Sequence, residues 1–117
     1  MRLIDSHAHL DEESFDVDRP DMIARALAAG VERMISIGTT VETSRKAITL
    51  AAEYPNIFAT VGIHPNYVHE AKPEDWDAIV ELAKSPKVVG LGETGLDRYW
   101  KFAPFDLQVD YFRRHMR

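Results

Sequence analysis

The chain has 117 residues, of which 45% are hydrophobic and 28% charged, so we expect a single domain over residues 1–117 with one hydrophobic core. It has no cysteine, which excludes disulfides, thiolate metal sites and cysteine nucleophiles. The formal net charge of -5 provides no basic surface for duplex nucleic acid, so a nucleic-acid substrate would have to be held by metal ions and local groups.

The N-terminal stretch "MRLIDSHAHLDEE" becomes acidic after a few apolar residues, so it does not resemble a signal peptide. No later apolar run approaches the length of a membrane span. These features predict a soluble, cytoplasmic protein that does not act at a membrane.

Short apolar runs alternate four times with segments of helical periodicity, which is the rhythm of βαβ units. The runs that predict strands are residues 2–5, 33–38, 57–63 and 87–93. Each run is short and nearly continuous, as is typical of a parallel sheet that is covered on both faces.

The first two predicted helices have recognisable boundaries. The first begins near Asp18, which is expected to supply the N-cap oxygen, has Pro20 in its first turn and ends at Gly30. The second follows Thr39, which has capping-box spacing with Glu42, and ends at "YPN".

The third predicted helix begins around Pro73, and the fourth begins around Pro104 and continues to the last residues of the sequence. Apolar residues at helical spacing predict the faces that pack on the sheet. In chain order they are Ile23, Ala26 and Leu27; Val41, Ile48, Ala51 and Ala52; Trp76, Ile79, Val80 and Ala83; and Phe105, Val109, Phe112 and Met116.

Polar residues follow each predicted strand. They are Asp5, Ser6, His7 and His9 after the first; Gly38, Thr39 and Thr40 after the second; His64 after the third; and Glu93 and Asp97 after the fourth. Because the loops at the carboxyl ends of parallel strands gather on one side, we expect these residues to share one rim.

His7 and His9 are two residues apart, so their side chains leave on one face if the strand extends through them, with Cα atoms about 6.5 Å apart. Two imidazoles at that separation can bind one cation. The alternative is an accidental pair that includes a surface loop residue, because so short a motif is unspecific. Asp5 either orients one of these rings or accepts a hydrogen bond at the start of the loop.

Glu93 emerges directly from an apolar strand, where a metal or a cationic partner would compensate its charge; a purely structural glutamate is the alternative. Gly90 and Gly92 fit a strand end that bends or lets another backbone approach closely. His64, with Pro65 holding the turn behind it, is a candidate to contact substrate, hydrogen-bond a water or transfer a proton. Its alternative role is to satisfy backbone carbonyls in a tight turn.

Two other histidines and two aromatic residues fall outside this pattern. His69 is expected in a loop and His115 on a helix surface. Tyr99 and Trp100 follow a strand end, where an aromatic ring can lie against a base or sugar. Packing within the loop is the favoured interpretation for both.

The motifs "DSHAHLD", "GIHP" and "GETGLD" together resemble the TatD-type metal-dependent deoxyribonucleases, relatives of the amidohydrolase superfamily, and the resemblance covers the whole chain. It implies a (βα)8 barrel with one or two metal ions that hydrolyses the phosphodiester bonds of DNA. It further implies that His7 and His9 bind one divalent ion, that Glu93 bridges two, and that His64 lies beside them. The metal is left open among Mg, Mn and Zn.

The sequence departs from this family in two respects. Arg98 stands where the family usually has an aromatic residue, and it either meets a phosphate or points to solvent. A closed barrel takes about 250 residues, whereas this chain supplies four βα units. The family's remaining ligands, two histidines and an aspartate on later strands, have no counterpart here. We therefore expect an α/β fold, a parallel (βα)4 half of a TIM barrel that is the N-terminal half of a longer enzyme.

Three functions are compatible with these residues. The first is a metal-dependent hydrolase that cleaves DNA with a metal-activated water, with His64 and Glu93 as catalytic residues. The second keeps the metal site but hydrolyses amide, ester or lactone bonds. The third is a non-catalytic fragment that forms homo-oligomers through its exposed sheet edges.

Overall fold

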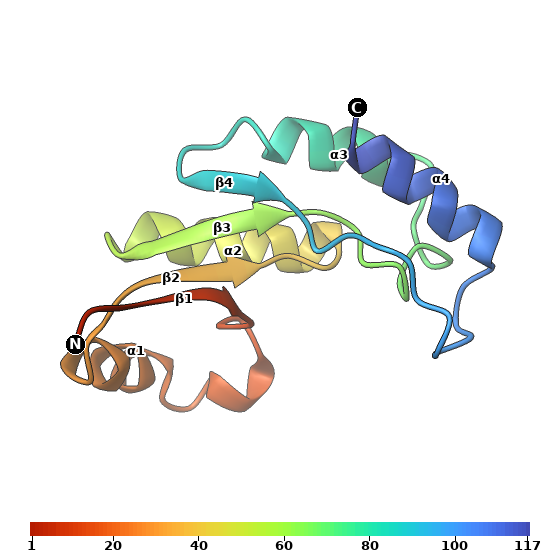
Figure 1. Ribbon diagram of the computed structural model, residues 1–117. Coiled ribbons are helices and arrows are strands. Elements are labelled where there is room, and N and C mark those ends of the chain that lie inside the picture. The colour runs from red at the N-terminus through yellow and green to blue at the C-terminus, as the bar shows by residue number, and fades with distance from the viewer.

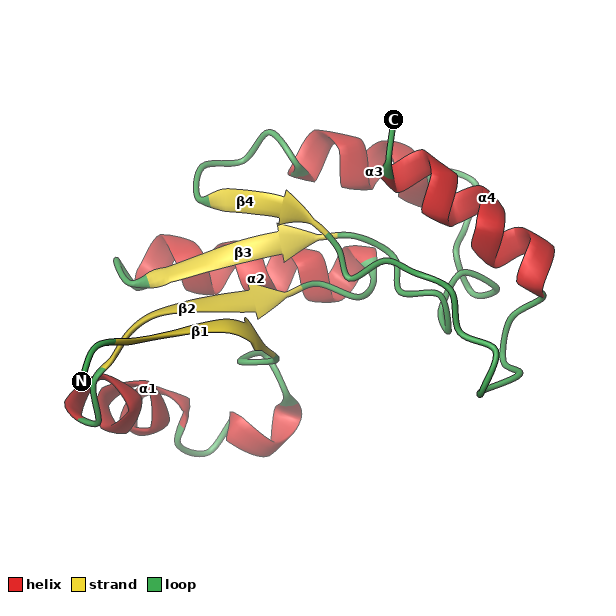
Figure 2. Cartoon of the chain, viewed as in Figure 1, coloured by secondary structure: helices red, strands yellow, loops and turns green.

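The computed structural model describes residues 1–117 as one parallel sheet flanked by helices (Figures 1 and 2). The strands are β1 (Leu3–Ala8), β2 (Val31–Ile37), β3 (Ile57–Val61) and β4 (Val88–Leu91). The α-helices are α1 (Arg19–Ala28), α2 (Val41–Glu53), α3 (Asp75–Leu82) and α4 (Phe105–His115), and a short 3₁₀ helix, η1, spans Glu13–Phe15. The strand order β1-β2-β3-β4 confirms the predicted (βα)4 unit.

The sheet is covered mainly on one face. Figure 1 shows α2 behind the sheet and α3 beyond the edge formed by β4, and no helix crosses the front of the sheet. The residues of β3 that are buried beneath the helices are Ile57, Ala59 and Val61. On the edge strands Ile4 and Val89 remain exposed. The prediction that the strands are covered on both faces is therefore wrong for this chain, because nothing packs on the concave front of the open sheet.

The core consists of two buried clusters that meet along β3. The first lies beneath α1 and α2 and contains Leu10, Ile23, Met34, Ala47, Leu50, Ala51, Ile57 and Ala59. The second lies beneath α3 and α4 and contains Val61, Ile63, Val68, Ile79, Ala103 and Tyr111. Packing at both ends of β3 supports the loops that leave the carboxyl end of the sheet.

The capping box of α2 is one residue later than predicted. The Thr40 side chain accepts a hydrogen bond from the Thr43 backbone N–H at 3.2 Å, and the Thr43 hydroxyl accepts one from the Thr40 N–H at 2.9 Å. The same hydroxyl accepts the Thr39 N–H at 2.8 Å. Glu42, the predicted partner, instead pairs with Lys46. A single hydroxyl that satisfies two backbone donors replaces the expected carboxylate.

Several details of the other helices also differ from expectation. Asp18 occupies the N-cap position of α1 but accepts no backbone hydrogen bond, since its carboxylate pairs with Arg25 at 2.9 Å. Gly30 has a φ of 95°, as its predicted place at the helix end requires. Four residues expected on packing faces are exposed, namely Leu27, Ala52, Val80 and Met116. The face of these helices that packs against the rest of the chain is therefore narrower than the apolar pattern predicts. None of the helices has the length and apolar character that crossing a membrane requires.

His115 is buried, with 7% of its surface exposed, so its predicted place on the helix surface is wrong. Its Nε2 accepts the Ile63 backbone N–H at 3.1 Å, and Nδ1 lies 2.8 Å from the Tyr111 carbonyl oxygen. The neutral ring with the proton on Nδ1 satisfies both contacts. The apolar pattern of α4 was misleading because its buried face includes Gln108 and His115, polar residues whose side chains are hydrogen-bonded.

Burial lowers the pKa of His115 below its usual value. We therefore expect the stability of the chain to decrease as the pH is lowered through the mildly acidic range. Below about pH 6.5 the unfolded chain binds a proton on this ring that the folded chain resists, and folding is penalised. His115→Leu should lose about 1–3 kcal/mol at neutral pH, because the Ile63 N–H loses its acceptor. It should also show a shallower loss of stability toward about pH 5.5.

Urea unfolding of both chains at neutral and acidic pH measures these two effects. His69→Leu, at a residue in a surface turn, serves as the matched control and should keep the pH dependence of the unsubstituted chain. Equal pH dependence in His115→Leu and the unsubstituted chain would contradict the assignment of this titration to His115.

Candidate metal centre

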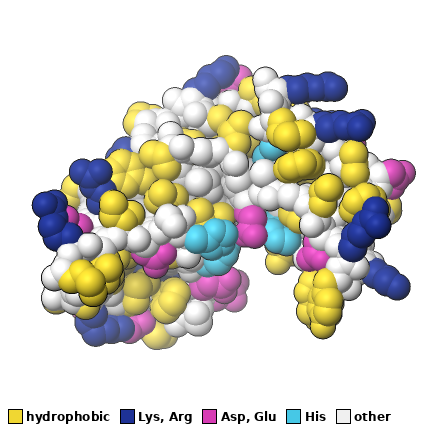
Figure 3. Space-filling model, in the orientation of Figure 1, with side chains coloured by type: hydrophobic (Ala, Val, Ile, Leu, Met, Phe, Trp, Pro, Cys, Tyr) yellow, Lys and Arg dark blue, Asp and Glu magenta, His cyan; other side chains and the backbone are white.

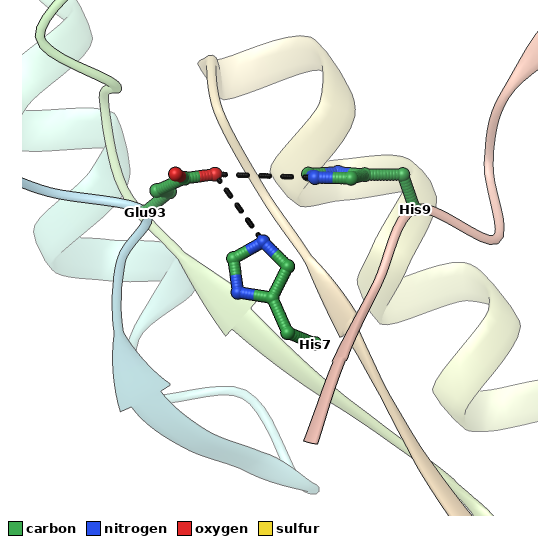
Figure 4. A group of neighbouring side chains, drawn as sticks. All are labelled: His7, His9 and Glu93. Carbon is green, nitrogen blue, oxygen red and sulfur yellow. Dashed lines mark ion pairs between the residues drawn. The ribbon is translucent and has the colours of Figure 1, made fainter. Parts of the chain in front are cut away.

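His7 and His9 lie at the carboxyl end of β1. The strand extends to Ala8, beyond the predicted residue 5, so His7 is within it and His9 follows directly. The two rings are 5.2 Å apart between centroids and inclined by 79°. Both present Nε2 toward Glu93 (Figure 4). The expected convergence of the two imidazoles on one face is therefore present.

Glu93 reaches these histidines because the segment after β4 crosses the end of β3. The Gly92 N–H donates to the Val61 carbonyl at 2.8 Å, and the Glu93 N–H donates to the carbonyl of Gly38, the residue after β2, at 2.6 Å. In a flat sheet β1 and β4 would lie about 14 Å apart. Sheet curvature and this crossing instead place Glu93 Oε2 at 3.6 Å from His7 Nε2 and 3.9 Å from His9 Nε2.

The crossing requires a glycine at position 62. A Cβ at Gly62 would lie 2.7 Å from the carbonyl carbon of Gly92, closer than real contacts allow. A Cβ at Gly92 would meet nothing nearer than 3.7 Å, and one at Gly90 nothing nearer than 3.5 Å. The close backbone approach predicted for this region is present, but Gly62 is the residue that permits it, and sequence reasoning missed it. Its only sequence signal is its place before "IHP".

His64 lies on the other side of Glu93. Its Nδ1 accepts the backbone N–H of Asn66 at 3.0 Å, so the neutral ring carries its proton on Nε2, which is 3.4 Å from Glu93 Oε1. The backbone N–H of His64 donates to the Thr39 carbonyl at 2.9 Å. The Asn66 N–H thus orients the ring, in addition to the turn at Pro65. The alternative in which the ring satisfies backbone carbonyls is wrong.

Asp5 takes the simpler of its two predicted roles. Its carboxylate accepts the His7 backbone N–H at 3.1 Å, but this local hydrogen bond lies within β1, since the strand continues to Ala8. No contact joins it to either imidazole. Asp5 therefore shapes the backbone beneath His7.

An open cleft of about 440 Å³ lies in front of these residues. His9, His64 and Glu93 form its floor, and Trp100 and Phe102 line it from the loop between β4 and α4. Figure 3 shows histidine and acidic side chains gathered at a hollow along one side of the molecule. No lysine or arginine lines the cleft, so its charge comes from glutamates and, if protonated, histidines.

The loop between β4 and α4 is attached to the His64 turn through Asp97. One carboxylate oxygen of Asp97 accepts the Asn66 side-chain N–H at 3.0 Å, and the other accepts the backbone N–H groups of Tyr99 and Trp100. These hydrogen bonds, with that from Asn66 the largest contribution, hold the pKa of Asp97 below its usual value. Arg98 does not line the cleft; it is exposed to solvent, as the second alternative expects, and its guanidinium carbon lies 4.0 Å from the centre of the Phe105 ring.

The donor set fits a divalent ion. One ligand atom each from His7, His9 and Glu93 lies within 4.8 Å of the others. Ligands that share a tetrahedral ion at bond lengths of about 2.1 Å are about 3.4 Å apart, close to the observed separations of 3.6 and 3.9 Å. Two imidazoles and a carboxylate suit zinc or manganese better than magnesium. We refer to these three residues as the metal centre.

Parallel βα units with imidazole and carboxylate side chains at the carboxyl ends of the strands define the class of metal-dependent hydrolases built on TIM barrels. A family model described as TatD related DNase matches residues 4–117. The chain therefore belongs to the TatD family, as the three motifs indicated.

Curated relatives and solved structures agree with this assignment. The chain is 40% identical over 114 residues to the uncharacterized metal-dependent hydrolase YabD of Bacillus subtilis, covering 97% of this chain and 45% of YabD. It is 42% identical over 95 residues to the 3'-5' ssDNA/RNA exonuclease TatD of Salmonella typhimurium, covering 81% and 36%. The crystal structure of YjjV, a TatD homologue from Escherichia coli, superposes with a TM-score of 0.90 at 28% identity, covering 98% and 45%. The chain thus spans less than half the length of these relatives, and its fold is that of half a barrel.

Proposed function

We propose that this chain carries part of the active site of a metal-dependent nuclease that hydrolyses phosphodiester bonds of DNA. The observation that carries the proposal is the convergence of His7 Nε2, His9 Nε2 and Glu93 Oε2 from opposite edges of the sheet. The Salmonella relative is named a 3'-5' ssDNA/RNA exonuclease, which supports a nucleic-acid substrate. Cytoplasmic location and self-association through the edges of β1 and β4 stay predictions.

In this proposal one divalent ion would be held by His7, His9 and Glu93. An ion held there supplies Lewis acidity, which activates water as a nucleophile near neutral pH. The second oxygen of Glu93, Oε1, lies 3.4 Å from His64 Nε2, so it faces His64 and not the other two donors. The family resemblance also implies that Glu93 bridges two ions; this stays a prediction, and it would require Oε1 to serve the second ion instead of facing His64.

His64 has a second role available, because its side chain is partly exposed at the cleft. Its Nε2–H can donate to a phosphate oxygen of a bound strand or to a water. Because Nδ1 already accepts the Asn66 N–H, Nε2 is the ring nitrogen that can donate to a substrate. We therefore propose His64 and Glu93 as the catalytic residues of this half of the site.

The proposal is tested by measuring metal binding and hydrolysis on the same preparation. We expect calorimetry to detect binding of zinc or manganese, and a single-stranded DNA oligonucleotide to be cleaved only with metal present. EDTA should abolish cleavage, and added metal should restore it. A panel of ester, lactone and amide substrates under identical conditions should remain intact.

The other two functions predict different results from these measurements. Metal-dependent cleavage of an ester or amide without cleavage of DNA would favour a hydrolase of the amidohydrolase type. A chain that binds no metal, cleaves nothing and elutes as an oligomer in gel filtration would favour the non-catalytic module.

A further inference from the structure

Three exposed aromatic rings stand at the rim of the cleft, on the loop between β4 and α4. The exposed fractions are 82% for Tyr99, 52% for Trp100 and 57% for Phe102. The rings contact one another, as the loop-packing interpretation expects, but they leave most of their surface uncovered. Figure 3 shows hydrophobic side chains projecting beside the hollow that holds the histidines. Exposed apolar surface of this kind commonly marks a binding site.

Trp100 and Phe102 differ from Tyr99 in that both line the cleft of the metal centre. Their rings are stacked, with centroids 5.5 Å apart and planes inclined by 15°. Tyr99 stands edge-on to Trp100, at 89°, and does not line the cleft. The stacked pair therefore offers flat ring faces beside the metal centre.

The loop that carries this pair is fastened at both ends by one buried side chain. Gln108, on α4, has 1% of its surface exposed. Its Oε1 accepts the Asp97 N–H at 2.8 Å, and its Nε2 donates to the Ala103 carbonyl at 3.0 Å. Because folding already orders the loop, the binding of a ligand to its rings carries no additional entropic cost of ordering the loop.

The charge of the cleft restricts how a polyanion could be held there. Glu12, Glu70 and Glu93 line it, and no lysine or arginine does. Attraction between basic side chains and phosphates, which usually dominates nucleic-acid binding, is therefore absent from the cleft. Base stacking on aromatic rings needs no cation and tolerates any base. Outside the metal centre the cleft thus offers aromatic ring faces together with uncharged hydrogen-bonding groups such as His64 Nε2–H.

We propose that Trp100 and Phe102 form a stacking site that positions an unpaired nucleobase of a single-stranded nucleic acid, the kind of substrate for which the Salmonella relative is named. The inference rests on the proposed function, since it assumes that the cleft receives a nucleic acid. Inside a duplex both faces of a base are covered by neighbouring bases, so a base can lie on the ring pair only where it is unpaired or at a duplex end. The stacked base would place the adjoining backbone near the metal centre.

The test measures binding without hydrolysis, in EDTA, from the fluorescence of Trp100. The chain has two tryptophans, and Trp76 packs against the second core cluster, so it serves as an internal reference. A short single-stranded oligothymidylate should quench the emission, whereas an abasic strand of equal length should not. Trp100→Ala and Phe102→Ala should each raise the Kd by between about 5-fold and 150-fold. Trp100→Phe should recover most of the affinity.

Tyr99→Ala is the matched control, because it removes an exposed ring of the same loop that does not line the cleft. It should change the Kd by less than about twofold. The Kd should also vary little between about 50 and 200 mM salt, a range over which binding through many phosphates weakens by a factor of about 1,000 or more. A self-complementary duplex should bind more weakly than the single strand.

Unchanged affinity in both alanine variants, equal binding of the abasic strand, or a steep salt dependence would overturn the inference. So would a dimer of the unsubstituted chain that Trp100→Ala converts to a monomer, because the rings would then be a contact between copies. Stacking with no metal-dependent hydrolysis would overturn the proposed function alone. Hydrolysis that is indifferent to both alanine substitutions would overturn the stacking site alone.

Discussion

Glu93→Gln is expected to weaken zinc or manganese binding by more than about 100-fold. Mutation of a residue that only hydrogen-bonds a metal ligand already lowers metal affinity about 10-fold to 100-fold, and Glu93 is itself a proposed ligand. The substitution keeps the shape of the side chain but removes the negative charge of the centre. The backbone hydrogen bond from residue 93 to Gly38 remains, so the crossing after β4 should persist. The free energy of unfolding of the metal-free chain should change by less than about 1 kcal/mol, because a partly exposed ion pair contributes little.

The neighbouring residues make this prediction specific. His7→Ala and His9→Ala should each cause a loss of metal affinity comparable to that of Glu93→Gln. His64→Ala should cause a smaller loss, about 10-fold, since its Nε2 faces Oε1 of the carboxylate and not the other two donors. Glu81→Gln, an exposed glutamate of α3 that pairs with Lys84, is the control and should bind metal normally. If calorimetry finds that Glu93→Gln binds metal as tightly as the unsubstituted chain, the metal ion does not bind at Glu93.

Gly62→Ala is expected to lower both the stability of the chain and its metal affinity. The added methyl group would lie 2.7, 2.8 and 2.9 Å from the carbonyl carbon, carbonyl oxygen and Cα of Gly92. Backbone atoms cannot rotate out of the way as a flexible side chain can, so the segment after β4 must move. Overpacking of this kind costs about 1–3 kcal/mol. The displacement also carries Glu93 away from His7 and His9.

Gly90→Ala provides the matched control, because its new methyl group would meet only the methyl of Thr60, at an ordinary 3.5 Å. It should change the free energy of unfolding by less than about 1 kcal/mol and leave metal binding intact. Urea unfolding and calorimetry on both variants measure the two effects. Similar behaviour of the two alanine variants would show that the close approach at Gly62 does not position Glu93.

The alternation of strands and helices was predictable because it depends on local periodicity. Ile23, Ile57 and Ile79 fall in the predicted strand or packing face and are fully buried. The errors have a common origin in polar groups whose partners are distant in sequence. Thr43 replaces Glu42 in the cap of α2, and His115 is buried because it accepts the N–H of Ile63, 52 residues earlier. Apolar periodicity does not register such contacts.

The grouping of the site residues was predictable for a topological reason. In a parallel sheet the carboxyl ends of the strands share one edge, so His7, His9, His64 and Glu93 were expected together, and they are. Their order around Glu93 was not predictable. It depends on the crossing of Gly92 over β3, which places two histidines at Oε2 and the third at Oε1.

By itself the sequence determined the family, the parallel (βα)4 unit and the identity of four residues at one rim, because motifs and strand ends are local features. The tertiary structure decided that the donor atoms lie within reach of one ion, that Gly62 makes room for this, and that Trp100 and Phe102 face the same cleft. These outcomes depend on the curvature of the sheet and on hydrogen bonds between distant segments, such as Asn66 to Asp97 and Gln108 to Asp97. Such interactions exist only once the chain has folded.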